Sequence, residues 1–400
     1  MKKRTVKMIN AVLAATMGLT LMAAGCGSSS GSSSTGSTAA DTTAPETSAA
    51  TEGTTSTASG EESSGAPGDV MSSEEIIRKA SGEGKISNWG IGNQYEILAL
   101  LAKYDLPLEY LSEDFTMDAF DDDTSTLASA MTYNELGLVK NSYDGAYGYG
   151  DTVGYIDMND EGVAMLEDNI FCTKEFAAQN PETVKAFLYA SIKGWQYAVE
   201  HPDEAAQIVY EAGSSVSQDH QKYMASEVAK LVETDMNGNT VTDIGKIDDA
   251  AMKQTLDIAQ QYVTLDDSSA QEAFAALTVD DICDSGLYDA AMASTDGKFN
   301  VEKNEVSIQL KWLPQAQFMG YYVADAKGYY DEVGLKVNIV SGGGDISETT
   351  AVNNGTVDFG VTWPTNMAVA NAGGMNLVEV AQIFQRSGMT VVYKYDNFRK

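Results

Sequence analysis

The alternation of two apolar patterns from Lys85 onward most restricts the fold of this chain. Short runs typical of strands, such as KISNW, LASAMTY, VSIQLKW and LKVNIVS, are each followed by a helical pattern or a polar loop. The clearest helix starts at Pro181 and places Val184 and Phe187 on one apolar face. Strands that alternate with helices in this way form mainly parallel sheets covered by helices. The pattern therefore predicts an α/β fold.

The length of the chain indicates two lobes. Residues 73–400 exceed the roughly 250–300 residues at which a single hydrophobic core stops growing. We assign residues 73–158 to an α/β lobe, named lobe 2, and residues 306–400 to the α/β part of lobe 1. Residues 159–292 would form a crossover and the helical part of lobe 1. The polar stretch 293–305 would connect the two parts of lobe 1.

The N-terminus carries a secretion pattern. A basic stretch, an apolar stretch and a zone of small residues follow one another up to Cys26, which is typical of a signal peptide that spans residues 1–25. The apolar part from Met8 to Ala24 is shorter than the roughly 20 residues of a membrane-spanning helix. The motif AAGC resembles the bacterial lipobox, which implies a lipid on Cys26 and a position on the outer face of the plasma membrane. A plain signal peptide with an incidental cysteine is the alternative.

The segment 26–72 has a low-complexity composition. It consists almost wholly of Ser, Thr, Gly, Ala, Glu and Pro, which bury too little apolar surface to offset chain entropy. We expect a disordered tether between the lipid and the folded body. A mucin-like or sorting role is the competing interpretation.

The charge of the chain makes nucleic acid an unsuitable partner. The formal net charge is −33, and removal of residues 1–25 takes away four basic and no acidic side chains, giving −37. Binding to phosphates requires clustered Lys and Arg. A solubilising acidic surface on a monomer is the simpler expectation.

The cysteines and histidines offer no metal or cofactor site. Cys172 and Cys283 remain after Cys26, and we expect two buried free thiols, with a disulfide between them as the alternative. His201 and His220 lie in polar surroundings without metal-ligand spacing. No cofactor is expected.

Residues 306–395 resemble the opening of the NMT1/THI5-like group of binding proteins. The motifs that carry the resemblance are KWLPQAQF, GYYVADAKGYYDEVGLKVNIV, SGGGD, NNGTVDFGVTW and AQIFQRSG. Residues 84–290 resemble the remainder of the same family, with GKISNWGIGNQYE, AMTYNEL, GYIDMNDEGV and NPETVKAFLYASIKGWQYAVEHPDEAA. The resemblance implies the two-lobed type 2 periplasmic-binding-protein fold. It also implies the delivery of a small solute to the permease of an ABC importer.

The order of these two segments is reversed relative to the family. We interpret the chain as a circular permutant in which residues 293–305 join the family's usual ends. A gene-assembly artefact is the alternative. The permutation predicts that one interlobe crossover is cut between Val391–Lys394 and the strand at Lys85. The lobes would then be connected by the one remaining crossover, near Asp157–Asn169, and by non-covalent strand pairing.

The predicted binding residues of lobe 1 follow its strands, because ligands of open α/β sheets bind beyond strand ends. By the resemblance, Trp312 stacks on the ligand ring, and a core Trp is the alternative. Polar groups that could contact the ligand follow the same or neighbouring strands; with Trp363 they are Gln315, Gln317, Asn366, Gln385, Arg386 and Ser387. Arg386 could pair with an anionic group or be a surface charge.

The predicted binding residues of lobe 2 come from two motifs. NWGIGN supplies Trp89, Gly92 and Asn93, with backbone N–H groups at a helix start that favour an anionic or carbonyl oxygen. The motif after LASAMTY supplies Tyr133, Asn134 and Glu135, a carboxylate that could accept from an exocyclic amine. We expect all of these residues to contact the ligand in one cleft, and none to be catalytic.

The sequence is compatible with three kinds of function. We favour a binding protein for a planar heterocycle such as a thiamine pyrimidine precursor or riboflavin, over a binder of sulfonate, nitrate or another small solute. A surface sensor or adhesion module with a vestigial cleft is the second alternative. An enzyme is the third, but the pyrimidine synthases of the family carry a His within the motif that matches WLPQAQF and a Cys-rich cluster. Here that position is Phe318, and residues 301–400 contain neither His nor Cys.

Overall fold

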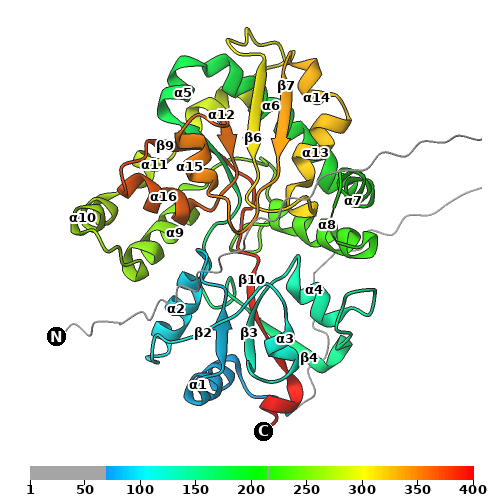
Figure 1. Ribbon diagram of the computed structural model, residues 1–400, viewed down its shortest axis with the longest axis vertical. Helices are drawn as coiled ribbons and strands as arrows, with labels where there is room; N and C mark the ends of the chain where they lie inside the picture. The colour runs from blue at the N-terminus through cyan, green and yellow to red at the C-terminus, as the bar shows by residue number, and fades with distance from the viewer. Residues whose placement is uncertain (1–68, 215) are drawn as a thin grey trace, which may run out of the picture. The chain divides into compact units, whose positions relative to one another are not determined.

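The computed structural model describes residues 69–214 and 216–400. The predicted signal peptide, Cys26 and the tether up to residue 68 lie outside the described residues. Within the described part of the chain, no helix has both the length and the apolar character needed to cross a membrane. The described residues form one compact body with two sheets (Figure 1).

Lobe 2 contains a five-stranded sheet with the order β2-β1-β3-β10-β4. Its strands are β1 (Ile86–Asn88), β2 (Leu111–Ser112), β3 (Leu127–Met131), β4 (Val153–Asp157) and β10 (Met389–Lys394). β1 pairs in parallel with β2 and β3, whereas β10 is antiparallel to β3 and β4. The helices of this lobe are α1 (Ser73–Glu83), α2 (Gln94–Lys103), α3 (Asp118–Asp121) and α4 (Glu135–Lys140), with short 3-10 turns η1 (Gly150–Thr152) and η3 (Tyr395–Phe398).

Lobe 1 contains a second five-stranded sheet with the order β7-β6-β8-β5-β9. Its strands are β5 (Asn169–Thr173), β6 (Glu305–Gln309), β7 (Lys336–Val340), β8 (Phe359–Gly360) and β9 (Leu377–Gln382). β6 pairs in parallel with β7 and β8, and β5 is antiparallel to β8 and β9. Each sheet therefore contains one strand that runs antiparallel to both of its neighbours. This strand is β10 in lobe 2 and β5 in lobe 1, and in each sheet it lies second from one edge.

The helices of lobe 1 cover its sheet and extend toward lobe 2. The first group comprises α5 (Lys174–Gln179), α6 (Pro181–Glu200), α7 (Pro202–Glu211), α8 (Gln218–Glu233), α9 (Asp249–Tyr262), α10 (Ser268–Ala276), α11 (Val279–Ile282) and α12 (Ser285–Met292). The second group comprises the 3-10 turn η2 (Ala316–Phe318), α13 (Met319–Ala326), α14 (Tyr329–Glu332), α15 (Glu348–Asn353) and α16 (Pro364–Ala372). The helices predicted around 181–200, 218–233 and 247–263 are confirmed.

Helix α6 shows how sequence leads to packing in lobe 1. Pro181 occupies the first turn, where its missing N–H has no partner to lose. Phe187 is fully buried and stacks on Phe359 of β8, with ring centroids 4.0 Å apart. Gly194 lets α6 approach α13, because a Cβ at this position would lie 2.2 Å from the carbonyl oxygen of Gly320. The helix is thus fixed against both the sheet and α13.

Two crossovers connect the lobes, which corrects one prediction. Residues 158–168 lead from β4 to β5, and residues 383–388 lead from β9 to β10. The expectation that only the crossover near Asp157–Asn169 connects the lobes is therefore wrong. The assignment of residues 306–400 to lobe 1 also needs correction, because β10 pairs with strands of lobe 2 (Figure 1). A buried apolar run such as MTVVYK carries no information about which sheet it joins.

The two ends of the described body lie side by side. Val70 and Arg399 form an antiparallel bridge, and the N–H of Met71 donates to the carbonyl oxygen of Phe398 at 3.0 Å. The N–H of Lys400 donates to the carbonyl oxygen of Asp69 at 2.6 Å. The folded body therefore starts and ends at one place in lobe 2.

Cys172 and Cys283, the cysteines among the described residues, are both free thiols, so the alternative of a disulfide between them is not realised. Cys172 is buried in β5, as expected for a strand with a small apolar side chain. Cys283 follows α11 and is half-buried, which differs from the expected full burial.

Candidate functional site

A cavity of about 110 Å³ lies between the two lobes, and we call it the inner cavity. From lobe 2 it is lined by Trp89, Ile91, Asn93, Phe115, Met131, Tyr133, Asn134 and Glu135. From lobe 1 it is lined by Lys311, Trp312, Gln315, Gln317 and Trp363. Each lobe therefore presents both aromatic and polar side chains to the same space.

The inner cavity lies at the carboxyl ends of parallel strands. Trp89 comes directly after β1, Trp312 shortly after β6 and Trp363 shortly after β8. Strand ends are the usual ligand position in open α/β sheets, because backbone and side chains diverge there to leave a crevice. Three of the predicted aromatic residues are thus brought together around one cavity.

Trp312 faces an aromatic residue of the opposite lobe. Its ring centroid lies 4.9 Å from that of Phe115, with the two planes tilted by 59°. Phe115 is 52% exposed, so this contact lies at the solvent side of the cavity. The pair joins the two lobes at this side of the inner cavity.

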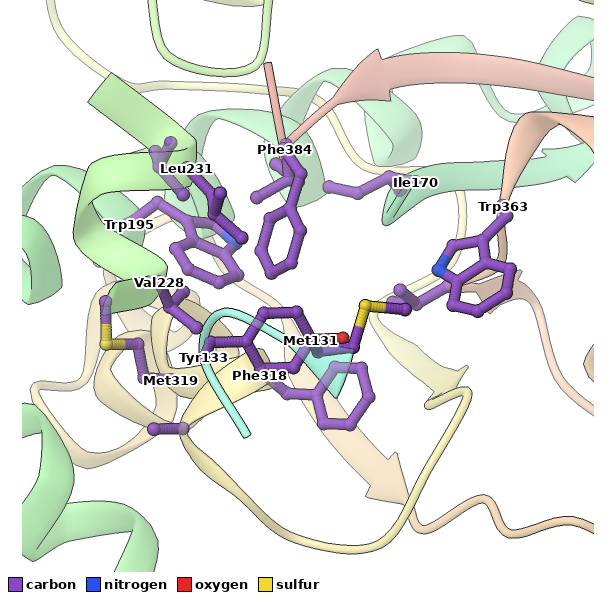
Figure 2. Close-up of a cluster of buried hydrophobic side chains, with 14 of the residues drawn as sticks. Met131, Tyr133, Ile170, Trp195, Val228, Leu231, Phe318, Met319, Trp363 and Phe384 are labelled. Atoms are coloured by element: carbon purple, nitrogen blue, oxygen red, sulfur yellow. The ribbon is translucent and has the colours of Figure 1, made fainter. Parts of the chain in front are cut away.

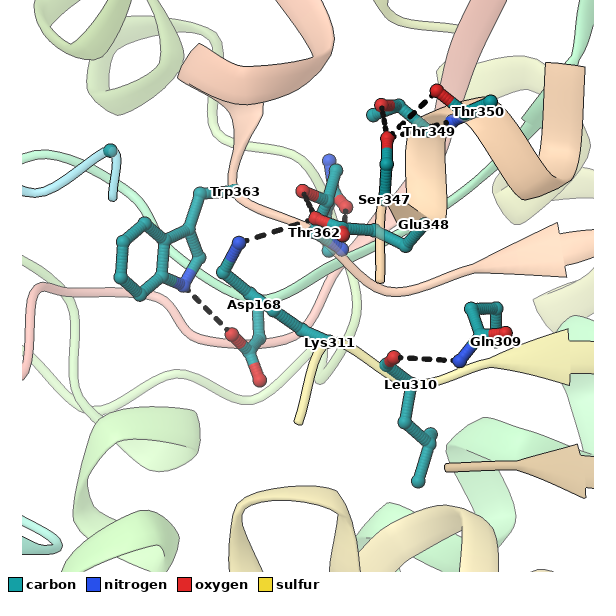
Figure 3. Close-up of polar contacts among 12 residues, drawn as sticks. Asp168, Gln309, Leu310, Lys311, Ser347, Glu348, Thr349, Thr350, Thr362 and Trp363 are labelled. Atoms are coloured by element: carbon teal, nitrogen blue, oxygen red, sulfur yellow. Dashed lines mark hydrogen bonds and ion pairs between the residues drawn. The ribbon is translucent and has the colours of Figure 1, made fainter. Parts of the chain in front are cut away.

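Asp168 holds two of the predicted residues from behind the cavity. Its carboxylate accepts from Nε2 of Gln317 at 2.8 Å. It also accepts from Nε1 of Trp363 at 3.0 Å (Figure 3). Oε1 of Gln317 in turn accepts from Nε2 of Gln315 at 2.6 Å. Burial raises the pKa of Asp168 to about 7. Asp168, at the end of the crossover 158–168, therefore fixes the orientation of the Gln317 and Trp363 side chains on the lobe 1 side of the inner cavity.

Lys311 is the cationic residue among those that line the inner cavity. Its Nζ lies 3.2 Å from Oε1 of Glu348 and 4.4 Å from the ring centroid of Trp363. Glu348 also accepts a hydrogen bond from the hydroxyl of Thr362 (Figure 3). The positive charge is therefore already paired, and its attraction for a ligand anion is reduced.

Glu135 and Asn134 form the start of a hydrogen-bond chain that crosses between the lobes. Oε2 of Glu135 accepts from the N–H of Met131 at 2.9 Å, and Oε1 accepts from Nδ2 of Asn134 at 2.6 Å. Oδ1 of Asn134 lies 2.8 Å from Nε2 of His220 on α8. Nδ1 of His220 lies 2.5 Å from the hydroxyl of Tyr143 in lobe 2. The amide of Asn134 is thus committed to protein groups on both sides.

Burial controls the protonation of the two titratable groups in this hydrogen-bond chain, Glu135 and His220. It raises the pKa of Glu135 to about 6 and lowers the pKa of His220 to about 4. The neutral imidazole can accept from Tyr143 and donate to Asn134 at the same time. His220 therefore contributes to the interlobe contact in its uncharged form.

Tyr133 lies partly in the core between the lobes. It is 3% exposed, and its ring meets Phe384 of the crossover 383–388 edge to face, at a centroid distance of 5.7 Å. Figure 2 shows Tyr133 and Met131 among Phe318 and other side chains of lobe 1. Tyr133 therefore joins the lobes as well as lining the inner cavity.

Two side chains of lobe 2 have buried polar atoms available for a ligand. Within residues 69–214 and 216–400, Nε1 of Trp89 and both amide atoms of Asn93 have no hydrogen-bond partner. Asn93 is 3% exposed and precedes α2 without capping it through its side chain. An unpaired buried polar group costs about 1–3 kcal/mol, so a bound group that pairs with these atoms would recover that cost.

Gly92 and Asn366 line a second cavity beside the first. The N–H of Gly92 donates to Oε1 of Gln94 at 2.7 Å, and the N–H of Gly90 donates to Oδ1 of Asn88 at 2.8 Å. Two of the backbone donors of the NWGIGN motif are thus already used by neighbouring side chains. This part of the prediction is corrected.

Three further predicted residues line neither of the two cavities. Gln385 donates its amide to backbone carbonyls of lobe 1. Arg386 pairs with Asp157 at 3.2 Å, and the hydroxyl of Ser387 donates to Glu167 at 3.1 Å. The reason is that β9 continues directly into a crossover, so the residues after it pack between the lobes.

The sequence interpretation missed several lining residues. They are Ile91, Phe115, Met131 and Lys311, together with Asp168 behind the wall. Ile91, Met131 and Lys311 lie within motifs that the sequence analysis singled out, near residues predicted to bind the ligand. Phe115 and Asp168 lie in a loop and a crossover, and no local pattern distinguishes them.

The geometry agrees with the comparison to known families. The NMT1/THI5-like family model matches residues 114–205 and 315–398. No curated protein matches the chain significantly. The matched segments contain lining residues from both lobes, including Phe115, Glu135 and Trp363. The match supports the resemblance to this family, which includes solute-binding proteins, and the predicted α/β class with a two-lobed type 2 binding-protein architecture is confirmed.

Proposed function

We propose that this chain is an extracytoplasmic solute-binding lipoprotein that delivers a small planar heterocycle to an ABC importer. The observation that carries the proposal is the inner cavity, which both lobes line with aromatic side chains at strand ends. A cleft between two lobes connected by two crossovers is suited to hinge closure around a solute. Closure would present one surface to the permease.

The ligand class follows from the chemistry of the walls. Indole faces favour offset stacking on flat rings, and Trp89, Trp312 and Trp363 all line the inner cavity. Nε1 of Trp89 offers a donor, and the amide of Asn93 offers both a donor and an acceptor. A thiamine-type pyrimidine or a riboflavin-like ring meets these requirements. A sulfonate or nitrate is less suited, because Lys311 is already paired with Glu348.

The location of the protein is part of the proposal. A lipid on Cys26 would anchor it to the outer face of the plasma membrane, and residues 27–72 would act as the tether. A monomer anchored in this way could then deliver a solute to a permease in the same membrane.

We also propose that the order of segments is a circular permutation. Each sheet contains one antiparallel strand that arrives from the other lobe, and the bridge between Val70 and Arg399 places the two ends together. The connection 293–305 makes specific contacts, since Glu302 accepts from the N–H of Thr183 at 2.8 Å. Adjacent ends and an ordered connection are what a natural permutation requires.

A thermal-shift screen tests the function. The mature chain with Cys26→Ser would be titrated with vitamins and their precursors. A ligand present at 100 times its Kd stabilises the folded state by about 2.7 kcal/mol. We expect a rise in Tm with a thiamine-type pyrimidine or riboflavin. A flat response to the whole panel, or a response to sulfonates alone, would refute the proposed ligand class.

A further inference from the structure

A second cavity of about 500 Å³ opens beside the inner cavity, and we call it the outer cavity. The two cavities share Ile91, Lys311 and Trp312 as a common boundary. A ligand that leaves the inner cavity past Trp312 would therefore enter the outer cavity.

The two cavities differ in size. An engineered apolar cavity of about 150 Å³ holds one benzene molecule. The inner cavity, at about 110 Å³, is thus suited to a single six-membered ring and not to a fused tricycle. Any long substituent on that ring must lie elsewhere, and the outer cavity offers the room.

The two cavities also differ in chemistry. The inner cavity has indole faces and the unpaired polar atoms of Trp89 and Asn93. The outer cavity is lined mainly by glycines, hydroxyls and amides, among them Ser347, Thr350 and Asn366. Hydroxyls and amides can each donate and accept, so they suit a group with several hydroxyls.

The charge of the outer cavity argues against an anionic substituent. Its charged lining residues are Lys311 and Glu348, which pair with each other at 3.2 Å. A phosphate carries close to two negative charges at neutral pH and needs unpaired cations or several free backbone N–H groups. The N–H of Gly92, at the edge of the outer cavity, is already bound to Gln94. The lining therefore favours an uncharged substituent.

We propose that the ligand has two parts, a single heteroaromatic ring in the inner cavity and an uncharged, hydroxyl-bearing arm in the outer cavity, as in a pyrimidine nucleoside. This inference rests on the proposed solute-binding function and narrows its ligand. It favours a single-ring compound over a flavin. The arm adds affinity through contacts with residues that a bare ring cannot reach.

Two series of three probes test the ring and the arm of the proposed ligand separately. The first series is cytosine, cytidine and cytidine monophosphate. The second is uracil, uridine and uridine monophosphate. Titration calorimetry would use the mature chain with Cys26→Ser. We expect at least one nucleoside to bind ten-fold or more tightly than its base, and its monophosphate to bind ten-fold or more weakly than the nucleoside. Equal affinity of base and nucleoside, or tightest binding of a monophosphate, would overturn the inference.

A cavity-filling variant gives a second readout. Ala370→Met on α16 fills space in the outer cavity, because Ala370 lines that cavity and not the inner one. We expect the variant to reduce nucleoside affinity to that of the base while base affinity stays the same. Ala326→Met, at an exposed position of α13, is the matched control and should change neither. An equal effect of Ala370→Met on base and nucleoside would contradict the two-part ligand.

The outcomes distinguish this inference from the function on which it rests. If bases bind as well as nucleosides and Trp312→Ala abolishes both, the two-part ligand is wrong and the solute-binding function stands. If only riboflavin binds, the inference also fails and the function stands. If none of the six probes, the thiamine-type pyrimidine and riboflavin binds, both fail.

Discussion

The ring of Phe115 in lobe 2 lies 4.9 Å from the indole of Trp312 in lobe 1, centroid to centroid, with a tilt of 59°. The two residues are far apart in sequence and lie in loops that follow strands of different sheets. Their contact lies at the solvent side of a cavity that both of them line. It therefore joins the two lobes beside the cavity in which we propose that a solute binds.

Loss of this aromatic contact should weaken ligand binding. Aromatic pairs contribute about 0.5–1.5 kcal/mol beyond area burial, so Phe115→Ala should raise the Kd of a bound heterocycle by roughly 2- to 10-fold. Titration calorimetry measures the change. Tyr210→Ala removes another exposed aromatic ring, on α7, and should leave the Kd unchanged. Equal Kd values for Phe115→Ala and the parent would exclude a role in closure.

His220 should make the folded state less stable in acid. Its folded pKa of about 4 lies below the ordinary 6.5, so its contribution is present above pH 6.5 and is lost as the pH falls toward 4. His220→Gln removes this titration, so the difference in Tm between parent and variant should shrink as the pH falls from 6.5 to 4. His201→Gln changes an exposed histidine and serves as control. A difference in Tm that stays constant over this range would contradict the prediction.

Glu379 should have the opposite effect on the pH dependence of stability, because it should make the folded state less stable in base. This fully buried residue of β9 accepts from Nδ2 of Asn169 at 2.7 Å, and its other carboxyl oxygen has no partner among the described residues. Burial raises its pKa to about 8, so its contribution is present below pH 4.5 and is lost as the pH rises through 8. Glu379→Gln should raise Tm at pH 8 relative to the parent and have less effect at pH 5. Thermal denaturation that shows no gain at pH 8 would show that Glu379 is not a buried acid.

The close approach of α6 and α13 should be sensitive to one methyl group. Gly194→Ala would place a Cβ 2.2 Å from the carbonyl oxygen of Gly320, which forces the helices apart. Overpacking of this kind costs about 1–3 kcal/mol of the free energy of unfolding. Gly82→Ala on α1 meets nothing within 4 Å and should be neutral or stabilising. Chemical denaturation compares the two variants, and equal stabilities would show that the helix contact can relax.

The adjacent ends allow a test of the permuted order. A chain that joins Lys400 to Asp69 through a short Gly-rich linker and opens within 293–304 would restore the order of the family. It should fold to a Tm near that of the parent, because the bridge between Val70 and Arg399 already holds the joined ends together. Circular dichroism and calorimetry measure this. A chain that stays unfolded would indicate that the present order is required.

Much of the fold could be predicted from the sequence, because helical spacing and strand-like runs depend on local chemistry. The helix at Pro181 and the strand ends before Trp312 and Trp363 are examples. The assignment of β10 to a lobe could not be predicted, since an apolar run fits either sheet. The crossover at residues 383–388 was missed for the same reason.

The candidate site was predicted in part. The strand-end rule identified Trp89, Trp312 and Trp363, which line one cavity. It failed after β9, where the chain crosses to the other lobe and does not turn back into a helix. It also missed Phe115 and Asp168, whose positions depend on how the two lobes meet.

A ligand site between the lobes can be tested by calorimetric titration of the mature chain, with Cys26→Ser, against the compound that gives the largest thermal shift. We expect saturable binding of one planar heterocycle per chain, and a Kd at least ten-fold higher for Trp312→Ala. Binding that is unchanged in Trp312→Ala, or no saturable binding of any heterocycle, would contradict a ligand site between the lobes.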